Sequence, residues 1–277
     1  MNPISKAYIK IIFSIFRRGI NSFYNSNTDQ NSTNKNYQKM LEMKQLVYKV
    51  FNFLIRSFEN EKNEYLVKIN FNKLPFYVRG LILSDIVMTS EAWEPYVKDI
   101  FVTKKSDVII DVGAHIGTYS IPKATEIGEE GKVIALEPNP MNSKILEKNI
   151  TLNKLNNIVI LEKAAGSKNE FVNLSLSSDP MLSMITNEEN KKSVKIECIK
   201  LDSLIKKLDL QKVNWLKIDA EGSEIQVLEG SKEILEKYHP KIIVEVRKEN
   251  EEKMMKILES YGYDIKYLNG EYFFAKI

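Results

Sequence analysis

Three short segments of the chain combine glycines or acidic side chains with an apolar run. The first, Asp-Val-Gly-Ala-His-Ile-Gly over residues 111–117, follows the apolar residues 108–110. Glycines where a strand turns into a helix let a ligand approach the backbone, and the helix N-terminus offers N–H donors without a helical partner. The spacing D-x-G-x-x-x-G differs from the G-x-G-x-x-G of dinucleotide-binding folds, which argues against a dehydrogenase. The candidate ligand-binding residues of this segment are Asp111, Gly113, His115 and Gly117.

The second segment places an acidic residue at the end of the next apolar run. Glu137 closes the stretch Val133–Glu137 and lies far enough beyond Asp111 for a helix and a returning strand. An acid at the end of the second strand, roughly 20 residues beyond a glycine loop, accepts hydrogen bonds from the ribose hydroxyls in nucleotide-binding folds. We therefore favour ribose binding by Glu137. The alternative is that its carboxylate caps the helix that follows.

The third segment, Leu216–Glu224, reads Leu-Lys-Ile-Asp-Ala-Glu-Gly-Ser-Glu and carries several ionisable side chains. Lys217, Asp219 and Glu221 leave the carboxyl end of a predicted strand, where open α/β sheets bind their ligands. If the strand stayed extended, the three would share one face, and one carboxylate would position a substrate or take its proton. The alternative is that one of them caps a helix beginning near Ser223, and the two roles can coexist.

From Asp107 onward, apolar strands alternate with helical stretches, which is the pattern of a parallel sheet covered on both faces. Asn269-Gly270 between two apolar runs predicts a closing antiparallel hairpin. The expected strands are Val108–Asp111, Val133–Glu137, Ile158–Glu162, Trp215–Asp219 and Ile242–Val246, an inserted pair Phe171–Leu176 and Val194–Ile199, and the hairpin strands Asp264–Leu268 and Tyr272–Ala275. The expected helices are Tyr119–Thr125, Asn142–Asn153, Glu224–Tyr238 and Asn250–Tyr261.

Further short motifs accompany the three segments, namely Lys-Ala-Ala-Gly at 163–166, Leu-Asp-Ser-Leu at 201–204 and Pro-Lys-Ile-Ile-Val-Glu at 240–245. From about Ser84 to the C-terminus the chain resembles the FkbM-type family of S-adenosylmethionine-dependent methyltransferases, most specifically in Lys-Ile-Asp-Ala-Glu-Gly. The resemblance implies an α/β, Rossmann-like class I methyltransferase fold, with a mainly parallel sheet and a C-terminal antiparallel hairpin. It also implies methylation of hydroxyl groups on sugars, glycolipids or secondary metabolites. The family usually has Asn where this chain has His115.

Carried over by position, the resemblance also implies roles for individual residues. Around the cofactor, Asp111, Gly113, His115 and Gly117 would surround the methionine moiety, Glu137 would hold the ribose, Glu162, Lys163 and Ala164 would flank the adenine, and Asp219 would lie near the transferable methyl. Methyl transfer to an alcohol requires alignment of the acceptor and removal of its proton. The general-base candidates are Asp219 and Glu221, followed by His115. Glu245 is either a substrate contact or a partner of Arg247, and no residue spacing compels a metal site.

The charge of the chain is unevenly distributed. Residues 1–58 contain nine Lys or Arg and two acidic residues, a net charge of +7, so the other residues carry −4 of the total of +3. An apolar stripe in this basic segment predicts a helix that packs on protein, which we favour, or that contacts a membrane surface peripherally. The stripe is formed by Ile9, Ile12, Phe13, Phe16 and Ile20. One Cys and two His exclude a disulfide framework and a multi-histidine metal site, and we expect a cytoplasmic protein or one peripheral to the inner membrane face.

Residues 1–100 are predicted to form an N-terminal extension, with an Asn-rich linker at 21–36, a helix at Tyr37–Phe58 and a half-buried strand at 65–71. Residues 101–277 are predicted to form the methyltransferase domain. We expect a small-molecule or glycan acceptor, although no motif identifies it. One alternative is an RNA methyltransferase, against which the presence of only five Arg argues. The other is a non-catalytic cofactor-binding or membrane-associated interaction protein that keeps the fold.

Overall fold

The computed structural model describes residues 11, 14–15, 65–90, 93–177, 179–186 and 193–277. The chain divides into two compact units, residues 1–95 and Tyr96–Ile277. The expected Asn-rich linker, the helix at Tyr37–Phe58 and the five residues of the N-terminal apolar stripe lie outside the described residues. Within the described ranges, no helix is both long enough and apolar enough to cross a membrane.

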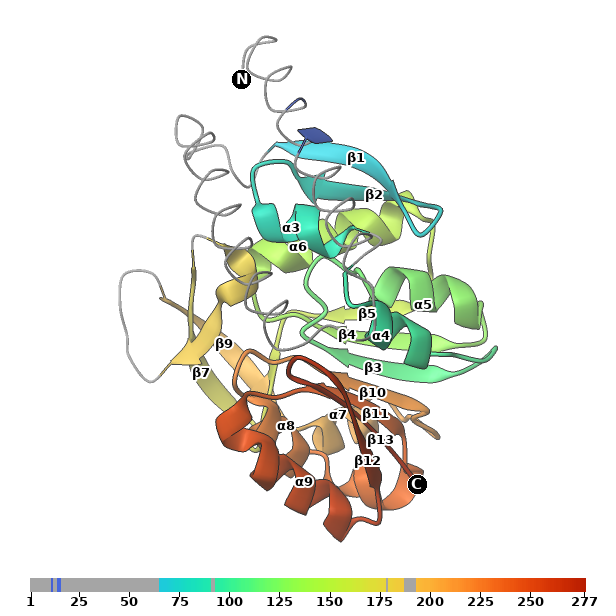
Figure 1. The fold of residues 1–277 in the computed structure, drawn as a ribbon, viewed down its shortest axis with the longest axis vertical. Helices are drawn as coiled ribbons and strands as arrows, with labels where there is room; N and C mark the ends of the chain where they lie inside the picture. The colour runs from blue at the N-terminus through green and yellow to red at the C-terminus, as the bar shows by residue number, and fades with distance from the viewer. Residues whose placement is uncertain (1–10, 12–13, 16–64, 91–92, 178, 187–192) are drawn as a thin grey trace, which may run out of the picture. The chain divides into compact units, whose positions relative to one another are not determined.

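The first unit contains an antiparallel hairpin of β1 (Leu66–Phe71) and β2 (Leu74–Arg79), followed by α3 (Leu83–Met88) (Figure 1). The strand expected at this place is confirmed as β1. Arg79 and Asp85 form a fully buried ion pair, in which Nε donates to Oδ2 at 2.8 Å and Nη2 donates to Oδ1 at 2.7 Å. This two-pronged geometry fixes the end of β2 against α3.

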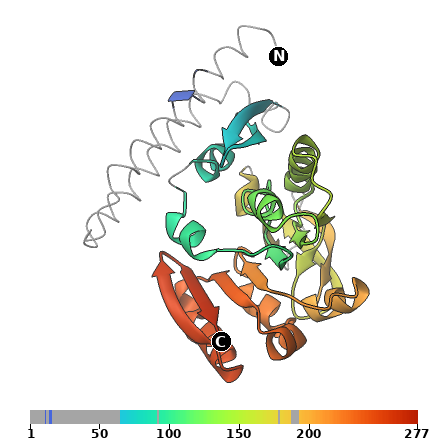
Figure 2. The same cartoon turned by 90° about the vertical axis from the view of Figure 1, so that its right-hand side faces the viewer.

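The second unit is built around a seven-stranded sheet (Figures 1 and 2). Its strands are β3 (Val108–Val112), β4 (Lys132–Leu136), β5 (Ile158–Leu161), β10 (Trp215–Ile218), β11 (Lys241–Glu245), β12 (Asp264–Asn269) and β13 (Tyr272–Lys276). They follow one another in space as β12-β13-β11-β10-β3-β4-β5. The five strands from β11 to β5 are parallel, whereas β13 is antiparallel to both of its neighbours. The predicted α/β fold, with a mainly parallel sheet and a C-terminal antiparallel hairpin, is confirmed.

Helices and aromatic side chains cover the two faces of this sheet. The helical elements are α4 (Pro95–Ile100), α5 (Ser120–Ile127), α6 (Pro140–Leu152), α7 (Leu201–Lys207), α8 (Glu224–Glu229), η3 (Ile234–Tyr238), η4 (Lys248–Asn250) and α9 (Glu251–Ser260). Ile110, Leu216 and Val244 belong to one apolar core together with residues of α7, α8, η3 and α9. Trp215 of β10 packs against Phe101, which directly follows α4, with ring centroids 4.8 Å apart. Both faces are therefore dry, as the apolar strands predict.

The single helix expected over Glu224–Tyr238 is wrong, because the chain is interrupted near Gly230 between α8 and η3. Gly230 packs against the backbone of Gly166, and a Cβ on Gly230 would lie 2.0 Å from the Gly166 carbonyl oxygen. Asp202 then supports the second helical part, since its Oδ1 accepts a hydrogen bond from Ile234 N–H at 3.2 Å. The interruption thus results from packing against a segment that is distant in the sequence.

A second, four-stranded sheet is inserted between β5 and β10. Its strands are β6 (Ala164–Ala165), β7 (Glu170–Ser175), β8 (Met184–Thr186) and β9 (Ser193–Ile199), in the order β6-β9-β7-β8. The two inserted strands expected from the sequence are confirmed as β7 and β9. A short 3-10 turn, η2 (Pro180–Leu182), connects β7 to β8.

Candidate active site

Five parallel strands end side by side along one edge of the large sheet, in the order β5-β4-β3-β10-β11. Parallel strands all present their carboxyl ends at the same edge, which is where open α/β sheets bind ligands. Each strand brings a residue that the sequence singles out, in the same order Glu162, Glu137, Gly113, Asp219 and Glu245. The fold therefore brings five separate parts of the chain to one candidate active site.

The loop after β3 has an unusual backbone. Gly113 and Gly117 have φ angles of 78° and 95°, and His115 between them has a φ of 51°, which residues with a side chain rarely adopt. His115 is buried, and its backbone N–H donates to Glu137 Oε2 at 2.7 Å. Strained backbone at a residue other than glycine concentrates at functional sites, so the geometry supports a ligand-binding role for this loop.

The Glu137 carboxylate is buried and joins the loop after β3 to the start of α6. Its Oε1 accepts hydrogen bonds from the N–H of Asn139 at 2.9 Å and from the side-chain amide of Asn142 at 3.2 Å. Asn139 is the N-cap residue of α6, and its own side chain accepts from Met141 N–H at 3.0 Å. Glu137 thus supports the start of the helix, as the alternative interpretation held, and the same hydrogen bonds fix its carboxylate at the end of β4.

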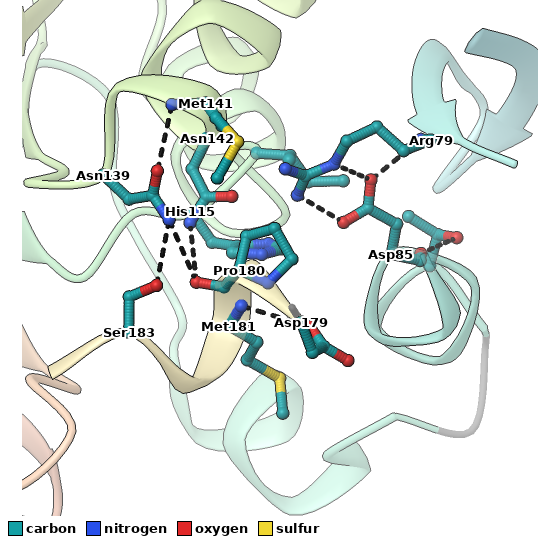
Figure 3. A network of polar contacts seen from close by, with 12 residues as sticks. Arg79, Asp85, His115, Asn139, Met141, Asn142, Asp179, Pro180, Met181 and Ser183 are labelled. Atoms are coloured by element: carbon teal, nitrogen blue, oxygen red, sulfur yellow. Dashed lines mark hydrogen bonds and ion pairs between the residues drawn. The ribbon is translucent and has the colours of Figure 1, made fainter. Parts of the chain in front are cut away.

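The two buried amides at the start of α6 also hold the inserted sheet. Figure 3 shows both side chains converging on the η2 turn: Asn142 Nδ2 donates to the Pro180 carbonyl at 3.3 Å, and Asn139 Nδ2 donates to Ser183 Oγ at 3.1 Å. Asn142 therefore bridges Glu137 and Pro180. The sequence alone does not indicate this bridge, because nothing in the local pattern relates Asn142 to a turn beyond β7.

A buried lysine joins the first segment to the third. Lys217 lies opposite Asp111 in the register of β10 and β3, and its ammonium is 3.5 Å from Asp111 Oδ1 and 3.2 Å from Asp219 Oδ2. Ser120 Oγ donates to the other Asp111 oxygen at 2.6 Å. The ammonium also lies 5.3 Å from the centre of the Tyr119 ring. Asp111 is therefore turned toward the interior, and Lys217 balances its charge and that of Asp219.

The chain does not stay extended beyond β10. Glu221 and Gly222 have φ angles of 50° and 102°, so the backbone turns sharply after Asp219. Lys217, Asp219 and Glu221 consequently do not share one face of a strand, contrary to the extended arrangement considered above. The capping role considered for one of them is not seen, since the start of α8 has no side-chain capping bond; Glu224 instead supports the turn before the helix, where its Oε1 accepts from the N–H of Gly222 at 2.7 Å.

The two carboxylates on this turn differ in acid–base character. Burial by itself raises the pKa of Asp219, but the charge of Lys217, with hydrogen bonds to Glu245 and Lys217, brings that pKa below its ordinary value. Burial, followed by the charge of Asp219, raises the pKa of Glu221 to about 7, against an opposing effect of Arg247. Neighbouring carboxylates whose surroundings separate their pKa values are typical of acid–base sites.

The end of β11 supplies two more residues to this edge. The Tyr272 hydroxyl donates to Glu245 Oε2 at 3.1 Å, and Glu245 helps to lower the pKa of Asp219. Arg247 lies beside Glu221 instead, with Nη2 3.9 Å from the Glu221 Oε2. Arg247 is thus a partner of Glu221, and Glu245 belongs to the surroundings of Asp219.

The segment after β5 occupies the other end of the edge, next to β4. Glu162 is exposed, the Lys163 ammonium forms an ion pair with Glu197 of β9, and Ala164 is buried at the start of β6. Because β5 is the neighbour of β4, this segment lies on the Glu137 side of the edge, away from Asp219. Within the described residues, no group of three or more His, Cys, Asp or Glu is arranged to hold a metal ion.

Comparison with known proteins identifies the family. A family model of the methyltransferase FkbM domain matches residues 111–265, which is more than half of the chain. The chain belongs to the FkbM methyltransferase family. It is therefore an S-adenosylmethionine-dependent methyltransferase, and the match runs from Asp111, at the end of β3, to Ile265, at the start of β12.

Known relatives of this FkbM-family chain are distant. Methyltransferase sdnD of Sordaria araneosa is 24% identical over an alignment 233 residues long, which covers 71% of this chain and 88% of that protein. Hexuronic acid methyltransferase AglP of Haloferax volcanii is 28% identical over 144 residues, 52% of this chain and 57% of that protein. A structure of methyltransferase FkbM from Methylobacillus flagellatus KT has a similar fold, with a TM-score of 0.50 and 18% identity over 70% of this chain and 52% of that one. The match thus spans little more than half of the AglP and M. flagellatus chains.

The edge fits the cofactor of the FkbM family in its chemistry. S-adenosylmethionine carries a sulfonium cation, an amino group and two ribose hydroxyls. A carboxylate attracts the sulfonium cation, and it accepts hydrogen bonds from the amino group and the hydroxyls. Glu137 and Asp219 supply carboxylates directly after neighbouring strands, Glu221 supplies a third on the turn beyond β10, and the strained loop from Gly113 to Gly117 lies between them. The residues present therefore suit a cationic nucleoside ligand.

Proposed function

We propose that this FkbM-family methyltransferase methylates a hydroxyl group on a sugar, glycolipid or secondary metabolite. The pKa of Glu221, raised to about 7 at the edge that carries the glycine loop, is the observation that supports the proposal most strongly. An alcohol is a poor nucleophile while it keeps its proton, and a base works best when its pKa lies near the working pH. The relative whose name describes a hexuronic acid methyltransferase supports a sugar acceptor.

Glu221 is the general base in this proposal. Its side chain is 28% exposed, so an acceptor can reach the carboxylate, and about half of the molecules carry it unprotonated near pH 7. Asp219 is a weaker base because its pKa is lowered, and its lasting negative charge suits the site of a cationic methyl donor. His115 is buried within the strained loop, and we assign it to the lining of the methionine end.

The remaining predicted residues hold the cofactor in this proposal. Gly113 and Gly117 bring the backbone close to the methionine moiety, Glu137 accepts from the ribose, and Glu162, Lys163 and Ala164 flank the adenine. When bound, S-adenosylmethionine supplies a methyl group that is already activated by the sulfonium charge. Asp111 supports the site indirectly in this proposal. Its contacts with Ser120 and Lys217 orient the start of the loop, and Lys217 in turn orients the Asp219 carboxylate.

The proposal is tested by combining cofactor binding with turnover. Calorimetry should show saturable binding of S-adenosylmethionine, weakened roughly tenfold or more by Glu137→Ala, because a buried acceptor of the ribose hydroxyls is lost. S-adenosylhomocysteine release should then depend on a hydroxylated acceptor, with glucuronic acid, glucose and a simple amine as the first panel. Glu221→Gln should keep cofactor affinity and lose roughly 10²–10⁴-fold in kcat.

The matched control for this experiment is Glu259→Gln, an exposed carboxylate on α9 outside the site. It should behave as the wild type in both assays. Full turnover in Glu221→Gln would remove Glu221 as the base, and turnover with the amine alone would refute hydroxyl methylation.

A further inference from the structure

The turn that carries Glu221 is held by a buried carboxylate that the chemistry above does not use. Glu224 is the first residue of α8, and its side chain folds back toward the preceding turn. Its Oε1 accepts hydrogen bonds from Gly222 N–H at 2.7 Å and from Ala220 N–H at 3.2 Å. The two donors are the residues on either side of Glu221. A single oxygen atom therefore holds the backbone before and after the candidate base.

The turn needs such support because its backbone is unfavourable. Glu221 has a φ of 50°, a conformation that residues with a side chain adopt only where the surroundings enforce it. Ser223, the N-cap residue of α8, makes no side-chain capping bond. On the outer side of the turn, the Arg247 guanidinium lies 3.4 Å from the place of a Cβ on Gly222. Glu224 therefore holds the backbone of the turn, and Arg247 lies beside it.

We propose that Glu224 is the positioning residue of the active site, which holds the left-handed turn so that Glu221 faces the acceptor. This role rests on the proposed function of Glu221. Glu224 itself does not contact the acceptor, because the residue is only 2% exposed. Within the part of the chain that the structure describes, its Oε2 makes no hydrogen bond. The contribution of the side chain therefore lies in Oε1 as an acceptor of two N–H groups.

This geometry predicts opposite results for two substitutions. Glu224→Gln keeps a carbonyl oxygen in the place of Oε1, whereas Glu224→Ala leaves the two N–H groups of the turn without their acceptor. We expect Glu224→Ala to lose roughly 100-fold in kcat, as displacement of a catalytic group by about 1 Å does, with cofactor affinity changed less than about threefold. We expect Glu224→Gln to stay within about fivefold of the wild type. Glu229→Ala, on the same helix but partly exposed and paired with Lys253, is the matched control.

A measurement without acceptor separates this proposal from the proposed function. The titration of Glu221, followed by carboxyl ¹³C NMR, should shift in Glu224→Ala from about 7 toward the ordinary value of 4.5, because the displaced side chain becomes solvated. Glu224→Gln also removes the charge of Glu224, which helps to raise this pKa, so its midpoint should fall less than in Glu224→Ala and stay well above 4.5. If wild-type protein turns over no acceptor but these titrations hold, the positioning role stands and hydroxyl methylation fails.

Two outcomes would overturn the positioning role. If Glu224→Gln moves the Glu221 titration or kcat as far as Glu224→Ala does, the carboxyl group itself is required and not its acceptor oxygen. If Glu224→Ala is folded and matches Glu229→Ala in both readouts, the turn does not need Glu224. Should Glu224→Ala fail to fold, Glu224→Gln takes its place: a kcat within about fivefold of the wild type supports the positioning role, and a loss as large as that of Glu221→Gln overturns it.

Discussion

Gly113 lies directly against the backbone carbonyl of Asp219. A Cβ on Gly113 would stand 1.8 Å from the Asp219 oxygen, and Asp219 N–H donates to the carbonyl of Val112 at 3.1 Å. The glycine loop and the acidic turn are far apart in the sequence, but they are therefore in direct contact at the centre of the edge. This contact joins the proposed cofactor loop to the proposed acid–base residues. Because the two backbones lie so close together, a single carbon added at Gly113 would disturb it.

We therefore expect Gly113→Ala to lower the free energy of unfolding by about 2–4 kcal/mol, from the left-handed backbone and the steric overlap together. Gly262→Ala is a matched control, because Gly262 has a similar φ of 81° and no atom within 4 Å of the added Cβ. It should show only the backbone cost of about 1–2 kcal/mol. Urea denaturation measures both variants. Equal losses of unfolding free energy would mean that the Asp219 carbonyl moves away from the added Cβ without destabilising the protein.

Activity should increase with pH through the titration of Glu221. Its pKa of about 7 means that the base becomes available as the pH rises past neutrality, so kcat should increase and level off above that value. The charge of Arg247 lowers this pKa, so Arg247→Gln should move the rising limb to higher pH. Lys253→Gln, a cation paired with Glu229 on the surface, should leave the profile unchanged. A rising limb near pH 4–5 would contradict the assignment of Glu221.

The strands and the three functional segments could be predicted from the sequence because their signals are local. An apolar run, a glycine loop and an acid at a strand end are each read from neighbouring residues. The shared edge then follows from the parallel order of the strands. The predicted Asp111 accordingly lies on β3, and Gly113, Glu137 and Asp219 directly follow the adjacent strands β3, β4 and β10.

Contacts between distant segments could not be predicted in the same way. The bridge from Asn142 to Pro180 depends on how the inserted sheet packs on α6, and the interruption at Gly230 depends on its contact with Gly166. The sharp turn at Glu221 replaced the extended strand considered from the sequence, since the local pattern does not reveal that Glu224 folds back. These features depend on tertiary packing, which overrides local preference.

The ionised form of Glu221 should cost stability. Its pKa in the folded protein, about 7, exceeds the ordinary value of 4.5, so the folded state holds its proton more tightly and stability falls as the pH rises between these values. Glu221→Gln should therefore raise the free energy of unfolding at pH 8 by up to about 3 kcal/mol, with little gain near pH 4.5. Glu259→Gln should show no such difference between the two pH values. Urea denaturation at both pH values provides the measurement, and an equal gain at both would contradict the raised pKa.

Lys217 should be the most costly side chain to remove from the edge. Lys217→Met leaves the buried carboxylate of Asp111 and the partly buried carboxylate of Asp219 without their shared cation, which should cost about 3–5 kcal/mol of unfolding free energy at pH 7. Burial would then raise the pKa of Asp219, so the loss should lessen as the pH falls and the carboxyl is protonated. Adding Asp111→Asn should recover part of the loss, because one of the two uncompensated charges disappears.

The control for this prediction is Lys256→Met, since Lys256 is exposed and pairs with Glu252 one helical turn away. An exposed pair of this kind contributes less than about 1 kcal/mol, so the control should remain close to the wild type. Urea denaturation of the four proteins at pH 5 and pH 7 tests the charge balance directly. If Lys217→Met lost no more than Lys256→Met, or if Asp111→Asn added to the loss, Lys217 would not be the cation that keeps Asp219 ionised.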